Sequence, residues 1–423
     1  MDLSLRAQAA GKPTPGVSLW DILQNLWDPD TNTSGFVSLG VAENTLMHDD
    51  ILKHIHASLS LTSKNLTYGD GSKRLRAAMS RFLTRQLAPV EPIEPGHILL
   101  TNGCSSAIEH LSWALANPGE AFLLAQPYYC TFPMDITLRT GVHVVPVPFE
   151  GVDPFSVGCV EMYEEALVQA QLGGTRIAGL ILCSPHNPLG RCYPREVLLR
   201  LMALCEKHGI HLVSDEIYAL SVWENTVDEH PPASPFESCL SVPSEGVIDP
   251  SRLHVLWGMS KDFGANGLRV GAIISQHNPA LHAALGPVSL YSSVSQMSEN
   301  ATASILEDEA WHDEYLANNR RKLSSCYEIA ASWAKENGIP YSKGVNAALF
   351  LWVDLGAAYV ARHPEAAGVD VDTIVMQALL KKKVYLAMGK DFGSEVPGWF
   401  RIVFSHPEEY LRMGLQRTIE ALE

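Results

Sequence analysis

Charged residues are scarce in this chain of 423 residues, because Asp, Glu, Lys and Arg together make up 18% of it, where about a quarter is usual. With 46% hydrophobic residues, this scarcity excludes a disordered chain and predicts a large folded core. Basic residues are also few, since 31 Lys and Arg face 47 Asp and Glu, for a formal net charge of −16. Such a surface repels phosphate backbones and anionic lipid headgroups, so we expect neither nucleic acid nor a membrane as a partner.

Long apolar runs and clustered cysteines are absent as well. No run reaches the ~18 apolar residues that a membrane span needs, and residues 1–8 lack a basic segment leading into an apolar one. We therefore expect a cytoplasmic protein. The eight cysteines include no Cys-x-x-Cys pair and no Cys/His cluster at zinc spacing, so we expect reduced thiols and no metal site.

Between residues 97 and 275, short apolar runs alternate with helical patterns. This alternation predicts a mostly parallel sheet covered by helices on both faces. The segment 194–208 has the apolar spacing of a connecting helix, and Gly209 follows it as a stop signal. The expected strands are 97–100, 121–124, 142–147, 177–183, 210–213, 253–256 and 270–274.

The pattern changes on both sides of this region. We expect a short amphipathic helix at 20–27 in an N-terminal arm, and a long helical stretch at 295–337 that precedes strands at 348–353 and 400–404. The fold class is therefore α/β: a large domain with a mostly parallel sheet between helices, plus a smaller α+β domain built from the N-terminal arm and the C-terminal part. The expected divisions are 1–50 for the arm and part of the small domain, 51–294 for the large domain and 295–423 for the small C-terminal domain.

Four of the expected strands are followed by unusually polar segments, which are 101–106, 184–190, 214–218 and 257–264. Ligands of an open parallel sheet bind beyond the carboxyl ends of its strands. We therefore expect these segments to form one site.

The order of these segments resembles the fold type I pyridoxal phosphate enzymes, specifically the class I/II aminotransferase family, over nearly the whole chain. Four motifs are similar to the branch that contains the 1-aminocyclopropane-1-carboxylate (ACC) synthases: GVAEN at 40–44, PYY at 127–129, SKD at 260–262 and PGWFR at 397–401. The resemblance implies pyridoxal 5'-phosphate as the cofactor, bound by the large domain. It also implies an L-amino acid or an amino-acid conjugate as the substrate.

The resemblance assigns the chemistry to five residues. Lys261 matches the lysine that forms an imine with the cofactor's aldehyde and that, displaced by substrate in an external aldimine, removes the α proton. Asp215 matches the carboxylate that keeps the pyridine nitrogen protonated. Asn187 and Tyr218 match the hydrogen-bond donors to the ring's phenolate oxygen. Tyr129, rather than its neighbour in the same motif, matches the aromatic residue that stacks on the ring.

Other residues match the contacts to the cofactor's phosphate. The first amides of a helix bind an anion, and Cys104 and Ser105 match such a helix start, together with Ser260 and the guanidinium of Arg269. Cys104 is expected to be a small buried residue rather than a reactive thiol. At Gly258 the chain departs from the family, which has Ser or Thr there, so one hydroxyl contact to the phosphate is missing.

Three further residues concern the substrate and the partner subunit. Tyr68 matches a tyrosine that reaches the phosphate in the other subunit, which implies a homodimer with shared active sites. Arg401 matches the clamp on the substrate's α-carboxylate, beside Asn187. Glu43 matches a carboxylate that faces the substrate in the ACC synthase branch, although a glutamate in such a loop is more often solvated.

The resemblance therefore implies a pyridoxal phosphate-dependent enzyme of specialised metabolism. It would be either an ACC synthase-like lyase, cleaving for example a carbon–sulfur bond by β or γ elimination, or an aminotransferase. A genuine ACC synthase acting on S-adenosylmethionine stays open, although such enzymes have Gln at the position of Thr45 and Leu-Pro in place of Ala265 and Asn266. A non-catalytic, cofactor-binding regulator also stays open, although the sequence shows neither the basic patch nor the DNA-binding domain expected of one.

Overall fold

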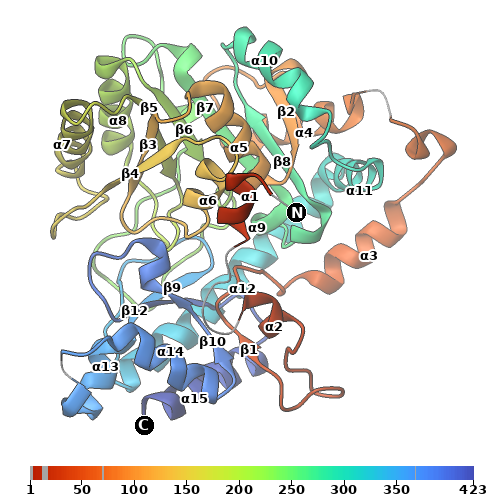
Figure 1. The fold of residues 1–423 in the computed structure, drawn as a ribbon. Helices are drawn as coiled ribbons and strands as arrows, with labels where there is room; N and C mark the ends of the chain where they lie inside the picture. Colours follow the sequence, from red (N-terminus) through yellow and green to blue (C-terminus); the bar gives the residue numbers. More distant parts are fainter. Residues whose placement is uncertain (1–2, 12–17, 69–70, 367) are drawn as a thin grey trace.

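The computed structural model describes residues 3–11, 18–68, 71–366 and 368–423. A seven-stranded sheet in the order β2-β8-β7-β6-β5-β3-β4 forms the centre of the larger part of the molecule (Figure 1). Strand β8 runs antiparallel to both of its neighbours, and the other pairs are parallel. The strands are β2 (Ile98–Asn102), β3 (Ala121–Ala125), β4 (His143–Val147), β5 (Ile177–Cys183), β6 (His211–Asp215), β7 (Leu253–Gly258) and β8 (Val270–Ile274). The mostly parallel sheet predicted from the sequence is thereby confirmed.

Alternate residues of the central strands pack into different hydrophobic clusters, so both faces of the sheet are covered. On one face, Leu123 and Leu180 pack with α4 (Lys73–Leu87), α7 (Cys159–Leu172) and α8 (Arg195–His208). On the other, Phe122 and Ile181 pack with α5 (Cys104–Leu115), α6 (Phe132–Thr137) and α10 (Pro279–Ser289). This burial on both sides explains why the strands are continuous apolar runs in the sequence.

Three more helices border this part of the molecule: α3 (His48–Ser58), α9 (Met259–Asp262) and α11 (Gln296–Glu307). The connecting helix α8 is close to its prediction, because Pro194 directly precedes it and Gly209 ends it with φ +64°. Glycine adopts this left-handed conformation without the steric cost that a Cβ imposes.

The smaller part of the molecule contains a three-stranded antiparallel sheet in the order β11-β12-β9 and a separate parallel pair, β1 with β10. The strands are β1 (Val37–Ser38), β9 (Phe350–Asp354), β10 (Val384–Tyr385), β11 (Ala387–Met388) and β12 (Trp399–Val403). The helices are α12 (Glu309–Glu336), α13 (Leu355–Arg362), α14 (Val371–Lys381) and α15 (Glu408–Leu422). The N-terminal arm thus contributes a strand to the C-terminal part, as the fold class predicted.

Helix α12 connects the two parts. Its residues Tyr315 and Leu316 belong to the core of the large sheet, whereas Leu323 and Tyr327 belong to the core of the smaller part. The division into 1–50, 51–294 and 295–423 stays a prediction.

Two helical segments differ from expectation. The stretch 295–337 is two helices, because the Asp308 side chain accepts a hydrogen bond from the Trp311 amide at 3.1 Å and starts α12. In the arm, α1 spans Leu5–Ala10 and α2 spans only Leu19–Leu23. The chain then leaves the helix, and Leu26 pairs with Phe36 in a parallel bridge.

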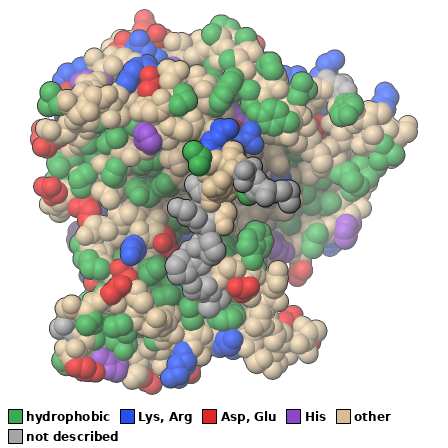
Figure 2. All heavy atoms as spheres, viewed as in Figure 1, with side chains coloured by type: hydrophobic (Ala, Val, Ile, Leu, Met, Phe, Trp, Pro, Cys, Tyr) green, Lys and Arg blue, Asp and Glu red, His purple; other side chains and the backbone are tan. Residues whose placement is uncertain are grey.

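Three observations concern membrane spans, metal sites and disulfides. No helix of the described residues is long and apolar enough to cross a membrane. Among these residues no group of three His, Cys, Asp or Glu could hold a metal ion, and the eight cysteines are free. Figure 2 shows basic side chains interspersed with acidic ones over the described part of this face.

Candidate active site

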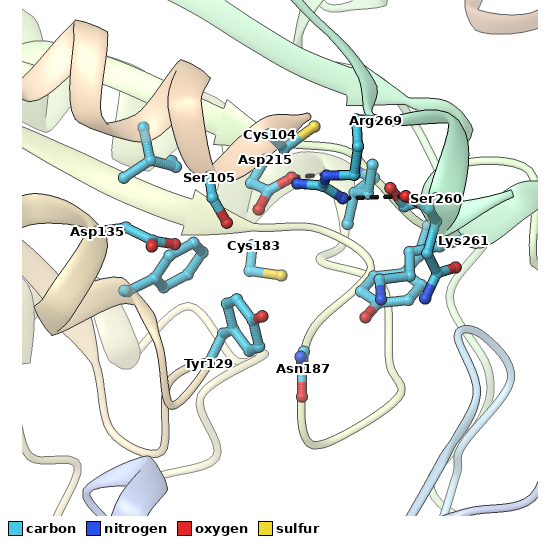
Figure 3. Close-up of a pocket in the computed structure, with 15 residues that line it drawn as sticks. Cys104, Ser105, Tyr129, Asp135, Cys183, Asn187, Asp215, Ser260, Lys261 and Arg269 are labelled. Atoms are coloured by element: carbon cyan, nitrogen blue, oxygen red, sulfur yellow. Dashed lines mark hydrogen bonds between the residues drawn. The ribbon is translucent and has the colours of Figure 1, made fainter. Parts of the chain in front are cut away.

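One pocket brings together nine of the twelve residues that the sequence singled out. It lies beyond the carboxyl ends of β5, β6 and β7, where the polar segments follow their strands (Figure 3). Its volume is about 630 Å³ including the space at its mouth, in the usual range for small-molecule sites. The nine residues are Cys104, Ser105, Tyr129, Asn187, Asp215, Tyr218, Ser260, Lys261 and Arg269.

Lys261 lies on α9, the short helix that follows β7. Its Nζ donates a hydrogen bond to the carbonyl oxygen of Ala42 at 2.6 Å. Burial and then the nearby Arg401 lower the pKa of Lys261 to about 8, against an opposing influence of Glu43. A lysine with such a pKa is partly the neutral amine near neutral pH, which is the form that reacts with an aldehyde.

Asp215 is the last residue of β6 and is 5% exposed. Among the described residues, its carboxylate accepts one hydrogen bond, from the Ile217 amide at 3.2 Å. Burial raises its pKa to about 7. A buried carboxylate with so few donors has room for a cationic partner, and a protonated pyridine nitrogen is one.

Arg401 lies beside this pocket, on β12 of the smaller sheet. It is 2% exposed, and its guanidinium donates to Asn187 Oδ1 at 2.9 Å and to the Gly40 carbonyl at 2.7 Å. The rings of Phe350 and Phe392 lie 4.5 and 4.8 Å from the guanidinium carbon. Its Nε has no hydrogen-bond partner, and of the described residues no carboxylate forms an ion pair with it. A buried cation in this state fits an anionic ligand.

The start of α5 and Arg269 form another part of the pocket wall. Gly103 precedes α5 with φ +80°, and a Cβ there would lie 2.3 Å from Arg269 Nη2. The guanidinium therefore packs directly over the helix start and donates to the carbonyls of Asn266 and Asn102 at 3.1 and 3.4 Å. Free helix amides and a guanidinium side by side suit a phosphate.

The departure at Gly258 has a steric counterpart in the structure. A Cβ at Gly258 would lie 2.6 Å from the Val270 carbonyl oxygen and 3.1 Å from Cys104 Sγ. Cys104 therefore occupies space beside Gly258, where the family resemblance predicts a hydroxyl, and burial raises the pKa of its thiol above the ordinary value. A buried thiol of this kind is a packing residue rather than a nucleophile.

The two tyrosines of the PYY motif differ in position. Tyr129 lines the pocket with its ring edge-on to Phe132 at 5.3 Å. Tyr128 packs instead against Gly393 at the smaller part of the molecule. Tyr218, from the segment after β6, also lines the pocket and is buried. Its ring is in edge contact with Phe350 at 5.3 Å, and burial raises the pKa of its phenol.

Two other predicted residues do not line the pocket of their own chain. Tyr68 is fully exposed and borders a separate groove with Leu290 and Gln296. Glu43 is half-buried in the loop that covers Lys261, and it lies close enough to raise the pKa of that lysine. Their roles at a partner's phosphate and at the substrate stay predictions.

The sequence analysis missed part of the pocket wall. Asp135, on the six-residue helix α6, hydrogen-bonds to Ser105 and Thr131, and burial raises its pKa to about 6. It follows no strand and matches no motif, so no signal in the sequence marked it. The other missed residues are Ile108, Phe132, Cys183 and Ile217, together with Asn266, which had been noted only as a departure from ACC synthases.

Residues 35–417 match the family model described as aminotransferase class I and II. The chain belongs to this family. Its members use pyridoxal 5'-phosphate, and the pocket fits that cofactor in three places. Asp215 can pair with the ring nitrogen, the start of α5 with Arg269 can hold the phosphate, and Lys261 can reach the aldehyde.

Comparison with characterised proteins gives three informative relatives. The ACC synthase-like protein 1 of Bos taurus is 34% identical over 94% of this chain and 78% of its own length. ACC synthase 3 of Oryza sativa subsp. japonica is 30% identical over 98% of this chain and 94% of its own. A Mus musculus protein named "probable inactive" ACC synthase-like protein 2 is 31% identical over 93% of this chain and 67% of its own.

The fold is also that of solved aminotransferase structures. An aspartate aminotransferase double mutant of Thermus thermophilus superimposes with a TM-score of 0.77, covering all of both chains at 22% identity. The predicted family and fold class are confirmed by these matches.

Proposed function

We propose that this protein is an enzyme that removes the α proton of an L-amino acid or amino-acid conjugate, with Lys261 as the base. Its reaction would be that of an ACC synthase-like lyase or an aminotransferase of specialised metabolism. The observation that carries the proposal is the convergence on one pocket of a lysine with a lowered pKa, a buried carboxylate and the Arg401–Asn187 pair.

Each of the residues around the substrate and the cofactor has a distinct role in this proposal. Arg401, with an unpartnered Nε, binds the α-carboxylate and thereby fixes the substrate's Cα beside Lys261. Because Asn187 Oδ1 accepts from Arg401, its amide NH₂ remains to donate to the cofactor ring, as does the Tyr218 hydroxyl. Asp215 holds a proton on the ring nitrogen. The cofactor, when bound, supplies an electron sink that makes the α proton acidic.

The test is product analysis with the cofactor-loaded protein and a panel of neutral, sulfur-bearing and acidic amino acids. A keto acid formed together with the amine form of the cofactor would identify transamination. Release of ammonia, a keto acid and a thiol would identify elimination. Exchange of the α hydrogen with solvent accompanies both, and its absence with every amino acid would contradict the proposal.

Two alternatives give different results in the same experiment. The names of the bovine and rice relatives favour including S-adenosylmethionine, from which a true ACC synthase would form the cyclic amino acid. The name of the mouse relative raises the case of a protein that binds the cofactor without turnover. Such a protein would show the absorption of lysine-bound cofactor near the edge of the visible range and no α-hydrogen exchange.

The proposal includes a homodimer with shared sites. Tyr68 is fully exposed, and Leu66, Leu290 and Tyr291 are exposed apolar residues, at 85%, 80% and 67%. Leu290 borders the same groove as Tyr68, and a second copy of the chain would cover such a surface.

Hybrid dimers test the shared site. If Tyr68 completes the partner's phosphate contacts, mixing Tyr68→Phe with Lys261→Ala subunits creates one site with both lesions and one with neither. Activity should then exceed that of either parent. Subunit exchange confirmed by mass, without any recovery of activity, would contradict sharing.

A further inference from the structure

The loop of residues 40–46 carries Glu43 and the Ala42 carbonyl that accepts the hydrogen bond from Lys261. Residues on two sides hold this loop in place. On the side of the smaller sheet, Ser405 Oγ donates to the Glu43 carbonyl at 2.6 Å, and the Thr45 amide donates to the Ser405 carbonyl at 3.0 Å. On the side of the large domain, Asn44 Nδ2 donates to Asn319 Oδ1 at 2.9 Å. The loop position therefore depends on residues that do not line the pocket.

Asn319 connects this loop to the helix that carries Lys261. It lies on α12, is 0% exposed, and donates through Nδ2 to the Asp262 carbonyl at 3.4 Å while its Oδ1 accepts from Asn44. Asp262 is the neighbour of Lys261 in the sequence. One amide side chain thus joins the segment that bears the lysine to the segment that bears its acceptor.

Packing around this bridge leaves little freedom. A Cβ at Gly264 would lie 2.3 Å from the Asn44 carbonyl oxygen, and His48 Nε2 lies 3.1 Å from the Gly264 carbonyl. The Asp262 carboxylate is itself fixed by donors from Leu220, Ser221 and Trp257, at 3.2, 2.7 and 3.0 Å. The helix segment is therefore anchored. If the bridge were lost, we expect the loop to shift on the side of Asn44, while its hydrogen bonds to Ser405 still hold the other side.

We infer that Asn319 is a positioning residue for the active-site lysine, acting through the Asn44 loop. By fixing the Ala42 carbonyl and Glu43 over Lys261, it keeps a hydrogen-bond acceptor and a negative charge next to a buried ammonium group. Both groups favour the charged form of the lysine, as Cys104 does, and oppose burial, Arg401 and Arg269, which favour the neutral form. The bridge therefore sets how much neutral amine Lys261 presents at a given pH. The role in catalysis rests on the function proposed above, whereas the effect on Lys261 itself does not.

The experiment measures the pKa of Lys261 directly. In cofactor-free protein, the rate at which Lys261 reacts with acetic anhydride is followed against pH by peptide mass spectrometry. Asn319→Ala should raise the dissociation constant of the ammonium about tenfold, the effect expected for one lost hydrogen bond to a charged group. Asn44→Ala should have the same effect. The double variant should go no further than either single one, because both remove the same bridge.

A matched control separates positioning from simple loss of stability. Asn225 also ties two segments, donating to the Val345 carbonyl at 2.7 Å, and it lies outside the Lys261 surroundings. Asn225→Ala should lower the melting temperature and leave the pKa of Lys261 unchanged. An unchanged or raised pKa in Asn319→Ala, or additive shifts in the double variant, would overturn the inference.

The cofactor-loaded protein separates this inference from the proposed function. Its visible absorption should titrate at a lower pH in Asn319→Ala than in the parent, and Lys261→Ala should lose the absorption of lysine-bound cofactor. If that absorption persists in Lys261→Ala, the proposed function fails. The labelling experiment would still decide the role of Asn319.

Discussion

Two charged residues that line the pocket, Asp215 and Arg269, differ in their exposure to water. Asp215 is 5% exposed and accepts one hydrogen bond, and burial dominates its pKa. Arg269 is exposed and lies over the start of helix α5. Charges in a dry environment act strongly on bonds that change during a reaction, whereas an exposed guanidinium mainly supplies attraction for an anion. The comparison supports the proposal that Asp215 acts on the chemistry and that Arg269 anchors the cofactor.

Removing the lysine should have the largest effect. Lys261→Ala removes both the amine that reacts with the aldehyde and the base for the α proton, so turnover should fall at least about a thousandfold. The melting temperature of the cofactor-free protein should change little. Steady-state rates measure the effect, with the exposed Lys343→Ala as the matched control. Activity within about tenfold of the parent would contradict the assignment of the chemistry to Lys261.

The second-largest effect is expected for Asp215, and it concerns how the stability of the fold changes with pH. In cofactor-free protein its raised pKa means that the folded state keeps a proton between about pH 4 and pH 7 that the unfolded state has lost. The corresponding stability is complete below about pH 4 and lost as the pH rises through about 7. Asparagine cannot lose this proton, so Asp215→Asn avoids the loss of stability. The melting temperature of the variant minus that of the parent should therefore be larger at about pH 8 than at about pH 5. A melting-temperature difference that stays the same at every pH would contradict the burial of Asp215.

Beside the start of α5, Gly258→Ala tests the packing against Cys104. The added methyl group would meet the Val270 carbonyl oxygen at 2.6 Å, so unfolding should become easier by about 1–3 kcal/mol. Cofactor affinity should fall as the start of α5 shifts. Chemical denaturation measures the change, and Gly96→Ala, where a Cβ meets no atom within 4 Å, is the control. Equal stability of the two variants would mean that the space at Gly258 adapts.

The smallest effect is expected for Glu43→Gln. A carboxylate beside Lys261 should disfavour substrates with an acidic side chain, so aspartate should be poorer than neutral or sulfur-bearing amino acids. The substitution should narrow that gap about threefold to tenfold in kcat/KM. If aspartate is the best substrate and the variant leaves its kcat/KM unchanged, Glu43 does not face the substrate.

The strands and their ends were predictable because fully buried parallel strands are continuous apolar runs. Strands β5 and β8 match their predicted ranges, and the residues after β5, β6 and β7 do meet in one pocket. Lys261, Asp215 and Asn187 belong to the polar segments that the sequence placed after these strands, and all three line that pocket.

The remaining features depend on contacts between distant segments. Asp135 reaches the pocket from a helix of six residues, and the rings that flank Arg401 come from Phe350 and Phe392. The bridge of Asn44 and Asn319 joins residues 275 positions apart. Local spacing carries no information about such pairs, because the chain brings them together only when both cores have formed.

Asp215 is proposed to act on the chemistry and Arg269 to anchor the cofactor. The most direct test of these two roles compares Asp215→Asn with Arg269→Gln. For each variant, the cofactor dissociation constant is measured, and the rate of deuterium loss from the substrate's Cα is measured at saturating cofactor. Arg269→Gln should weaken cofactor binding at least about tenfold and leave the exchange rate within about threefold of the parent. Asp215→Asn should slow exchange at least about a hundredfold, with a smaller change in binding. The same pattern in both variants, or the reverse one, would contradict the account.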